Sequence, residues 1–547
     1  MRLKKNSSEQ KLRGAYYTPA DMARVMVRLA TKRSYSSILE PSCGDGVFLD
    51  CLYDQDLMNK AEMTAVEIEP GEAQKVKEKY RSRSEVHVLC EDYFDFYKGN
   101  SDKKYDLILG NPPYIRYQYL TEKQREIQAD ILTSHGMKSN KLINAWVAFL
   151  VSCVQLLSDK GTIAFVIPAE ILQVAYAEDL RLYLSNNLDT ITLITFKQLV
   201  FTDIEQEVLI FIGEKGSNSH GIRIIEMDDL SELNNLIVED YHYRELLHVK
   251  EKWTKYFVSS DMEVLQAIRS DSRFIQFSDY GLINVGITTG NNKYFSIDEA
   301  TEKEYSLSSV TLPLIGRSSH AHGIYFTWED WQKNVRSGKR AMLISFPEIP
   351  IEQYPEAHIR YIQNGEANNE HMGYKCSIRD RWYIVPSVWV PDAFFLRRNN
   401  LYPKFVLNAC GAVSTDTMHR MKFNKDVAPE DVLLSYYNSI SFAFTEVCGR
   451  SYGGGVLEIL PGEMGKIMLP RITENVDKAL KQGLLSYVDQ VVRNDEDIEK
   501  ALDVVDQRLL VDKLGISTDM CKQCREVWKK LQNRRLTRGD KLLEVNP

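Results

Sequence analysis

Short apolar runs alternate with longer amphipathic stretches in the N-terminal part of the chain. The runs are rich in β-branched residues and bounded by glycine, proline or acidic side chains, which is typical of buried strands. They predict strands over residues 38–40, 63–69, 86–90, 106–110, 162–167, 191–196 and 207–212. Apolar positions at helical spacing predict helices over residues 22–29, 71–80 and 142–157. Strands that alternate with helices predict an α/β fold, and the last two strands are close enough in sequence to pair antiparallel.

The pattern changes near residue 245. Helical periodicity fades, Gly, Asn, Ser and aromatic residues become more frequent, and the strands look short and turn-rich. Residues 471–535 then become helical again. We therefore expect three parts: an α/β domain over 1–244, a mixed α+β domain over 245–470 and a helical segment over 471–547.

Composition adds a few limits to this picture. The 547 residues are 44% apolar and 26% charged, which is typical of a globular protein. We find no run of about 18 apolar residues and no apolar core of a secretory signal, so neither a membrane span nor a signal peptide is expected. The nine scattered cysteines fit reduced thiols in a cytosol. Cys521 and Cys524 form a CxxC without a second Cys or His pair, which favours two thiols on a helix over a zinc site.

Charge gives only a coarse indication of the partner. The net charge of −8 argues weakly against a nucleic acid, although a basic channel can lie on an acidic body. Residues 521–541 are rich in lysine and arginine. This stretch suits either a helix that contacts phosphates or a solvated amphipathic helix.

The least ordinary stretch follows the strand predicted over 106–110. Asn111, Pro112, Pro113 and Tyr114 come directly after a buried apolar run. The two prolines fix two φ angles, remove two backbone donors and push the residues before them away from helix. A stiff turn with an amide at its base and an aromatic ring at its tip is therefore predicted where open α/β sheets bind ligands. A proline-rich surface turn is the alternative.

A glycine-containing turn follows the strand that ends at Glu40. Gly44 and Gly46 allow a tight loop, and a helix begins near Val47. In nucleotide-binding turns of this kind, the glycines let the backbone approach a ligand at the helix N-terminus. The turn is neither a full GxGxxG nor a P-loop, so a cofactor without a pyrophosphate fits better. Glu67, at the next strand end, suits ribose hydroxyls, with an exposed charged strand end as the alternative.

Three further segments accompany these turns. Thr18 is suited to cap a helix whose first residue is Pro19. Asp92 and Tyr93 follow the strand over 86–90. At this place Asp92 can accept a hydrogen bond from an adenine amino group, and Tyr93 can cover the adenine ring. Residues 115–140 are polar, charged and poorly periodic, which predicts a mobile lid beside the proline turn.

These features occur in a characteristic order: Gly-x-x-Tyr-Thr-Pro at 14–19, the glycine turn, the acidic strand ends and Asn-Pro-Pro-Tyr. In this order the sequence resembles the gamma group of adenine-N6 DNA methyltransferases, which are familiar from restriction–modification systems. The resemblance covers residues 14–213 by specific motif and 245–470 by layout. It implies a Rossmann-like S-adenosylmethionine-dependent methyltransferase domain over 1–244. It also implies a C-terminal α+β target-recognition domain, followed by the helical tail.

The resemblance implies S-adenosyl-L-methionine as the cofactor and no metal. The residues implied to bind the cofactor are Tyr17, Thr18, Glu40, Ser42 and Gly44 at the methionine portion, Glu67 at the ribose, Ile68, Asp92 and Tyr93 at the adenine, and Asn111 and Pro113 near the sulfonium.

Catalytic roles follow from the same resemblance for Asn111, Pro112, Tyr114 and Phe201. The N6 amine of adenine is a poor nucleophile because its lone pair is conjugated with the ring. The Asn111 side-chain oxygen and the Pro112 carbonyl would accept its two hydrogens and aim the lone pair at the methyl group. Tyr114 and Phe201 would stack on the two faces of the flipped adenine, with a core position as the alternative for Phe201.

The implied partner is double-stranded DNA, and we expect a monomer in the cytoplasm of a prokaryotic cell. Arg317, Arg381, Arg397 and Arg398 are candidate base readers, with an ordinary surface role as the alternative. Whether a separate cognate endonuclease exists is a question of genomic neighbours.

Three other functions stay open at this point. Cytosine-N4 transfer uses related chemistry, but that group usually has serine where Asn111 stands. Some RNA and protein methyltransferases share the Asn-Pro-Pro-Tyr chemistry. A non-catalytic DNA-binding subunit is the alternative from a different class.

Overall fold

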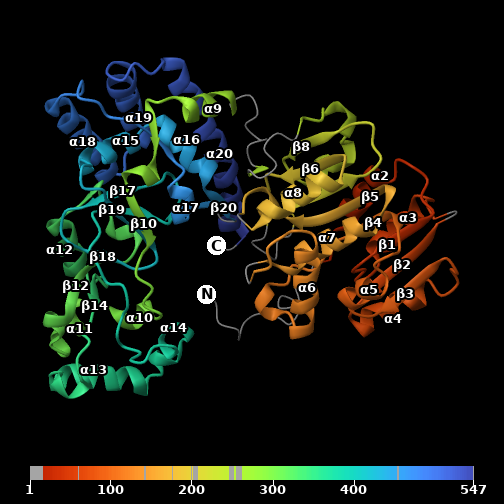
Figure 1. The fold of residues 1–547 in the computed structure, drawn as a ribbon, viewed down its shortest axis with the longest axis horizontal. Helices are drawn as coiled ribbons and strands as arrows, with labels where there is room; N and C mark the ends of the chain where they lie inside the picture. Colours follow the sequence, from red (N-terminus) through yellow and green to blue (C-terminus); the bar gives the residue numbers. More distant parts are fainter. Residues whose placement is uncertain are drawn as a thin grey trace. The chain divides into compact units, whose positions relative to one another are not determined.

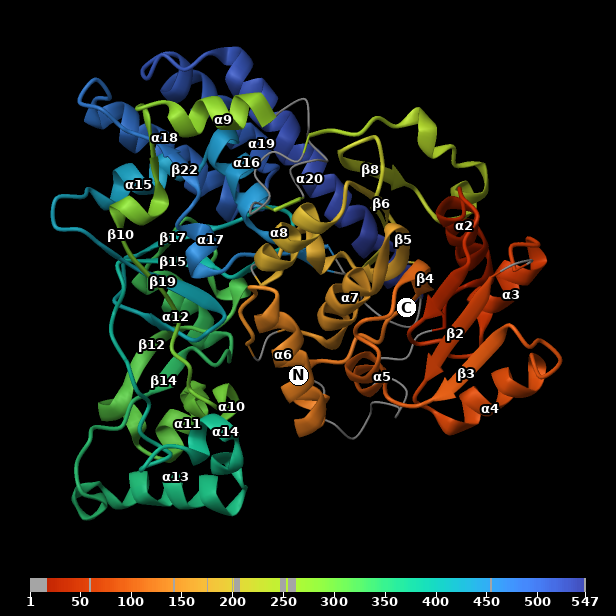
Figure 2. The same ribbon diagram turned by 45° about the vertical axis from the view of Figure 1, so that its right-hand side comes forward.

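The structure is a computed structural model of the chain. It describes residues 17–58, 61–140, 143–174, 176–198, 200, 207–245, 252–253, 262–452 and 455–545. The chain divides into two compact units, residues 1–257 and 258–547. Each unit is described by itself (Figures 1 and 2).

An eight-stranded sheet forms the centre of the first unit (Figure 1). Its order is β3-β2-β1-β4-β5-β7-β6-β8, and all neighbours are parallel except that β7 runs antiparallel to β5 and β6. The predicted α/β class and the antiparallel pairing of the last two predicted strands are thus confirmed. The strands are β1 (Ser37–Glu40), β2 (Glu62–Glu67), β3 (Val86–Cys90), β4 (Tyr105–Gly110), β5 (Leu157–Pro168), β6 (Thr190–Phe196), β7 (Val208–Glu214) and β8 (Gly221–Met227).

Helices cover both faces of this sheet. Along β4, Leu107 and Leu109 pack with α2, α3 and α4, whereas Ile108 packs with α5, α6 and α7. Because both faces are covered, the central strands are apolar at nearly every position. The helices are α2 (Ala20–Ala30), α3 (Val47–Asp54), α4 (Pro70–Lys79), α5 (Tyr93–Gly99), α6 (Glu122–Ser134), α7 (Ala145–Leu156) and α8 (Ala177–Asn187).

The segment after the proline turn contains a helix, although the sequence pattern there was poorly periodic. A short 3₁₀ turn, η2 (Tyr117–Tyr119), leads into α6. Thr121 and Gln124 form a capping box at the start of α6, and Ile131 and Leu132 are buried. The irregular pattern read from the sequence was wrong over 122–134, because only four positions of α6 are buried (Ile127, Gln128, Ile131 and Leu132) and one of them is polar. The lid itself stays a prediction.

The N-cap of the first helix lies one residue later than predicted. Pro19, not Thr18, occupies the N-cap position of α2, and no side chain caps this end. Thr18 is buried in the extended segment before the helix. The expected capping role of Thr18 is therefore incorrect.

The described residues of the second unit form a mixed α+β structure with three small sheets and one two-stranded pair. The sheet orders are β10-β19-β15-β17-β13, β11-β14-β12-β18, β16-β21-β20 and β22-β9. The strands are β9 (Phe274–Gln276), β10 (Gly281–Val285), β11 (Ser296–Ile297), β12 (Thr311–Ile315), β13 (Tyr325–Phe326), β14 (Met342–Ile344), β15 (Ala393–Leu396), β16 (Arg398–Asn399), β17 (Phe405–Asn408), β18 (Val413–Ser414), β19 (Met418–Phe423), β20 (Arg450–Tyr452), β21 (Val456–Glu458) and β22 (Met468–Pro470).

Helices surround these sheets, and the longest ones lie near the C-terminus (Figure 2). They are α9 (Met262–Ser270), α10 (Asn292–Phe295), α11 (Glu299–Glu304), α12 (Trp328–Arg336), α13 (Glu356–Ala367), α14 (Tyr374–Ser377), α15 (Pro429–Tyr436), α16 (Ser439–Cys448), α17 (Pro461–Met464), α18 (Lys478–Arg493), α19 (Ile498–Val505) and α20 (Thr518–Val545).

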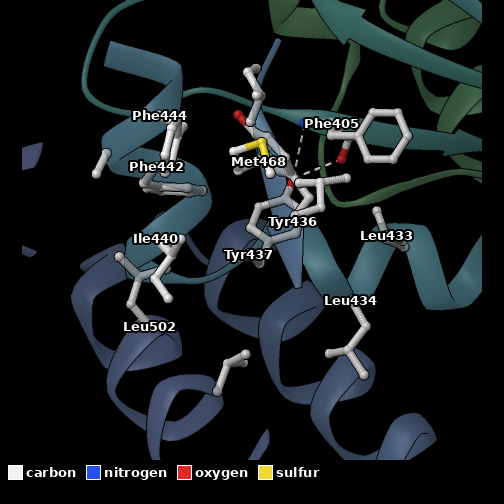
Figure 3. Packing of buried hydrophobic residues seen from close by; sticks show 14 of the residues in the cluster. Phe405, Leu433, Leu434, Tyr436, Tyr437, Ile440, Phe442, Phe444, Met468 and Leu502 are labelled. Atoms are coloured by element: carbon white, nitrogen blue, oxygen red, sulfur yellow. Dashed lines mark hydrogen bonds between the residues drawn. The ribbon is translucent and has the colours of Figure 1, made fainter. Parts of the chain in front are cut away.

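The C-terminal helices share one apolar core with the strands that precede them (Figure 3). The Tyr437 hydroxyl donates to the Phe405 carbonyl at 2.7 Å. Leu502 of α19 belongs to the same cluster, and Trp528 of α20 meets Phe442 of α16 edge to face, with ring centroids 5.3 Å apart. The helical segment 471–547 therefore folds as part of the second unit, because its apolar faces are buried against α15 and α16.

Internal carboxylates neutralise several cations of the basic helix α20. Arg525 pairs with Asp506 at 3.1 Å, and Arg535 pairs with Glu446 at 2.9 Å. Cys521 and Cys524 lie on the same helix, as predicted, and both are buried. A role in phosphate binding is therefore not available to these two arginines. Among the described residues, no helix is long and apolar enough to cross a membrane.

Candidate active site

A cavity of about 630 Å³ opens at the carboxyl ends of β1, β2, β3 and β4. The sheet order reverses between β1 and β4, and open α/β sheets bind ligands at such a switch point. The cavity is lined by Tyr17, Pro41, Ser42, Gly44, Glu67, Ile68, Glu69, Glu72, Glu91, Asp92, Tyr93, Phe94, Asn111, Pro113, Ile115, Tyr119, Leu120, Gln124, Ala145 and Phe149.

The glycine turn after β1 forms one wall of this cavity. Gly44 and Gly46 have φ angles of +52° and +83°, which residues with a Cβ rarely adopt. The Gly44 amide donates to Glu67 Oε2 at 2.8 Å, and the Glu69 amide donates to Glu67 Oε1 at 2.9 Å. The turn is thus tied to the end of β2, and the Glu67 carboxylate is held in a fixed orientation at the cavity wall.

Glu40 is buried next to this turn without a complete set of partners. Its side chain is 1% exposed, and Oε2 has no hydrogen-bond partner. Burial, assisted by the nearby carboxylates of Asp45 and Glu67, raises the pKa of Glu40 well above its usual value. Burial and the charges of Glu72 and Asp45 likewise raise the pKa of Tyr17. This negative surrounding suits a ligand that carries positive charge.

Glu40 gives a prediction about pH. A carboxyl group whose folded pKa lies above its unfolded value stabilises the fold below about pH 4.3 and loses that contribution as the pH rises toward the folded pKa. Glu40→Gln does not titrate. We therefore expect the ligand-free variant to melt a few degrees higher than the wild type near pH 7 and to lose this advantage near pH 4, measured by calorimetry. A variant that melts at or below the wild-type temperature near pH 7 would contradict this account.

Asp92 is the N-cap residue of helix α5 and lines the cavity. Its Oδ1 accepts from the Phe94 amide at 2.7 Å, and its Oδ2 accepts from Gln124 Nε2 at 2.6 Å. Tyr93 lines the cavity from the core side, since it is 3% exposed and its ring stacks on Phe149 at a centroid distance of 4.4 Å. The aromatic wall here therefore contains more than the single ring that the sequence suggested.

The proline turn adjoins the same cavity. Ser42 Oγ donates to the Asn111 carbonyl at 3.2 Å, so the two turns are joined. The Tyr114 hydroxyl donates to Asn111 Oδ1 at 2.8 Å and to the Val166 carbonyl at 3.2 Å. Pro112 is buried and Tyr114 is half-buried. The amide of Asn111 and the ring of Tyr114 therefore lie together at the end of β4.

Most residues predicted for cofactor binding line one cavity. Nine of the predicted positions do so: Tyr17, Ser42, Gly44, Glu67, Ile68, Asp92, Tyr93, Asn111 and Pro113. Thr18 and Glu40 are buried and do not reach the lining. Phe201 lies outside the described residues.

Sequence reasoning missed several lining residues. Phe149 lies on α7, which is buried on nearly every side, so periodicity could not identify the face toward the cavity. Gln124 had a usable signal, because Thr121 and Gln124 have the spacing of a capping box.

Comparisons with known proteins agree with this arrangement. A family model described as Eco57I restriction-modification methylase matches residues 26–201. A second, described as the C-terminal domain of type II methyltransferase M.Eco57I, matches residues 250–510. The chain belongs to the type II family of restriction–modification DNA methyltransferases. The predicted resemblance to restriction–modification methyltransferases is thus confirmed.

Two of the relatives named here extend over most of the methyltransferase, and a third covers less than half of it. M.AccI of Acinetobacter calcoaceticus is 25% identical over 479 residues, which cover 83% of this chain and 84% of the relative. M.XamI of Xanthomonas campestris pv. amaranthicola is 23% identical over 476 residues, or 84% and 85% of the two chains. M.HincII of Haemophilus influenzae is 32% identical over 228 residues, or 41% and 42% of the two chains.

Two solved structures share the fold of the methyltransferase. The type IIL restriction-modification enzyme MmeI, solved in complex with DNA, has a TM-score of 0.53 and 13% identity and covers 94% of this chain and 75% of its own. The DrdV–DNA complex has a TM-score of 0.51 and 10% identity, with coverage of 99% and 71%. At these identities the likeness concerns the fold.

Proposed function

We propose that this methyltransferase transfers a methyl group from S-adenosyl-L-methionine to the N6 amine of an adenine flipped out of duplex DNA. The place of Asn111 carries the proposal. It lines the cavity at the end of β4, and its side-chain oxygen already accepts a hydrogen bond from Tyr114 at 2.8 Å. An amide acceptor and an aromatic ring thus meet at the edge of a cavity suited to a cofactor.

The cavity fits the proposed cofactor by charge and by its polar groups. Carboxylates of Glu67, Glu72 and Asp92 line the cavity and favour a ligand with positive charge. Beside them, a buried oxygen of Glu40 has no hydrogen-bond partner. When bound, S-adenosylmethionine supplies an activated methyl group on a positively charged sulfur. The proposed binding residues are those expected from the sequence: Tyr17, Thr18, Glu40, Ser42, Gly44, Glu67, Ile68, Asp92, Tyr93, Asn111 and Pro113.

Two acceptors of the proline turn would act on the substrate amine. The Asn111 side-chain oxygen and the Pro112 carbonyl would each accept one of its hydrogens, which draws the nitrogen lone pair out of conjugation. Both acceptors sit in a turn stiffened by two prolines and tied to Ser42, so little reorganisation is required when the amine arrives. The amine proton would leave to solvent after transfer.

Tyr114 would hold the flipped adenine by stacking. Its hydroxyl now occupies Asn111 Oδ1, so base entry would require Asn111 to accept from the amine in addition to, or in place of, the tyrosine. Phe201 remains the proposed second stacking residue.

Target recognition is proposed for residues 245–470, and catalysis for 1–244. Arg317 is exposed and suits a base reader. Arg397 and Arg398 both pair with Glu458, at 2.9 Å and 3.3 Å, which makes them weaker candidates. We further propose a monomer in the cytoplasm of a prokaryotic cell, acting with or without a separate cognate endonuclease.

A transfer assay with labelled S-adenosylmethionine tests the substrate class. We expect label in duplex DNA and none in total RNA or in protein from the same cells. Label in RNA or protein, with none in duplex DNA, would contradict the proposal. Absence of cofactor binding by calorimetry would instead favour a non-catalytic subunit.

A further inference from the structure

We propose that Gln124 is a positioning residue for the cofactor, acting through the carboxylate of Asp92. The inference rests on the proposed function, in which Asp92 accepts a hydrogen bond from the adenine amino group of the cofactor. Gln124 lies on α6, outside the motif segments, and lines the same cavity.

The Asp92 carboxylate is held by one donor at each oxygen. The Phe94 amide donates to Oδ1 at 2.7 Å, and Gln124 Nε2 donates to Oδ2 at 2.6 Å. The first contact is local to helix α5 and fixes only one end of the group. The second comes from a different helix and sets the rotation of the carboxylate about its Cβ–Cγ bond. The direction in which Oδ2 faces the cavity therefore depends on Gln124.

The capping box decides which end of the Gln124 amide meets Asp92. Gln124 Oε1 accepts from the Thr121 backbone amide at 2.9 Å, and the backbone amide of Gln124 donates to Thr121 Oγ1 at 3.2 Å. With its oxygen used in this way, the side chain presents its nitrogen to Asp92. Donor and acceptor ends are thus assigned by the hydrogen-bond network.

Helix α6 is fixed in place by contacts with the core and with the turn before it. Ile131 and Leu132, further along the helix, are buried in the core. Arg125 Nε donates to the Tyr117 carbonyl at 3.1 Å, which closes the turn before the helix. Because the Gln124 side chain is already ordered by these contacts, little side-chain entropy is lost when a ligand binds.

A neutral donor also suits the chemistry of the site. A lysine or arginine at position 124 would neutralise Asp92 and compete for its oxygens. The amide holds the carboxylate and leaves its charge, so Oδ2 keeps a lone pair for an incoming amino group. Gln124 thereby orients the acceptor without occupying it completely.

The variant Gln124→Glu separates this role from the role in the fold. Glutamate preserves the Thr-x-x-Glu capping box but replaces the donor to Asp92 with a second carboxylate. We would measure binding of S-adenosylhomocysteine to the full chain by calorimetry. A parallel titration uses the analogue whose purine lacks the 6-amino group. Lys123→Ala is the matched control, because it removes the neighbouring ion pair between α6 and Asp95, at 2.7 Å, without touching Asp92.

We expect Gln124→Glu to lower the affinity for S-adenosylhomocysteine about tenfold or more, the effect typical of losing a charge-assisted hydrogen bond. The analogue without the amino group should bind the variant and the wild type within about twofold, because it makes no bond to Asp92. Lys123→Ala should bind both ligands as the wild type does.

Two results would overturn the inference while the wild type still binds S-adenosylhomocysteine. One is an unchanged affinity in Gln124→Glu, and the other is an equal loss for both ligands, which indicates a general effect on the fold. A wild type that binds neither ligand would overturn the proposed function and this inference with it.

Discussion

Replacing Asn111 by alanine is expected to lower the rate of methyl transfer about 100- to 1,000-fold, the loss typical of removing one preorganised hydrogen-bonding group that acts in the transition state. The amide oxygen of Asn111 is one of only two proposed acceptors for the amine hydrogens. Its backbone carbonyl contact with Ser42 does not depend on the side chain, so the turn should keep its shape. Single-turnover transfer to DNA, with saturating S-adenosylmethionine, measures the effect.

Two controls make this result specific. Asn234→Ala removes an exposed asparagine side chain from the same unit and should transfer at the wild-type rate. S-adenosylhomocysteine should bind Asn111→Ala within about tenfold of the wild type, because most of the cavity lining is unchanged. A wild-type transfer rate in Asn111→Ala would remove Asn111 from the catalytic assignment.

Replacing Arg535 by methionine is expected to destabilise the second unit by about 3–5 kcal/mol, the usual loss when one partner of a buried ion pair is removed. Arg535 and Glu446 are 1% and 2% exposed, and their side chains lie 2.9 Å apart. Burial raises the pKa of Glu446, and the arginine opposes that shift. Without the arginine, Glu446 must either lie unpaired in the core or take up a proton. Urea unfolding monitored by circular dichroism measures the change in the free energy of unfolding.

The double variant Glu446→Leu/Arg535→Met is the informative companion. It removes both charges, so much of the lost stability should return. Lys500→Met breaks an exposed ion pair with Glu496 and should not change the urea concentration at the midpoint of unfolding. A single variant as stable as the wild type would show that the buried pair does not hold α20 against α16.

Strands bounded by strong signals were predictable from the sequence. The strand over 86–90 coincides with β3, and the strand that ends at Glu40 coincides with β1. Strand β8 (Gly221–Met227) was missed, because Arg223 and Glu226 interrupt its apolar run, and its parallel partner β6 lies earlier in the chain. Long-range pairing of this kind leaves little local trace.

The site was predictable where the chemistry lies at strand ends. Glu67 ends β2, and Asp92 and Asn111 come just after β3 and β4, so the parallel arrangement of these strands brings all three to one edge of the sheet. Contacts made by helices could not be predicted in the same way. The bonds from Gln124 to Asp92 and from Tyr114 to Asn111 depend on how α6 and the proline turn pack, which single-sequence periodicity does not determine.

Analysis of the modified nucleoside tests the central claim most directly. DNA would be methylated by the purified protein with isotopically labelled S-adenosylmethionine, digested to nucleosides and examined by mass spectrometry. We predict that all the label appears as N6-methyldeoxyadenosine. Label in N4-methyldeoxycytidine, with none in N6-methyldeoxyadenosine, would contradict the assignment of Asn111 and its turn to an adenine amine.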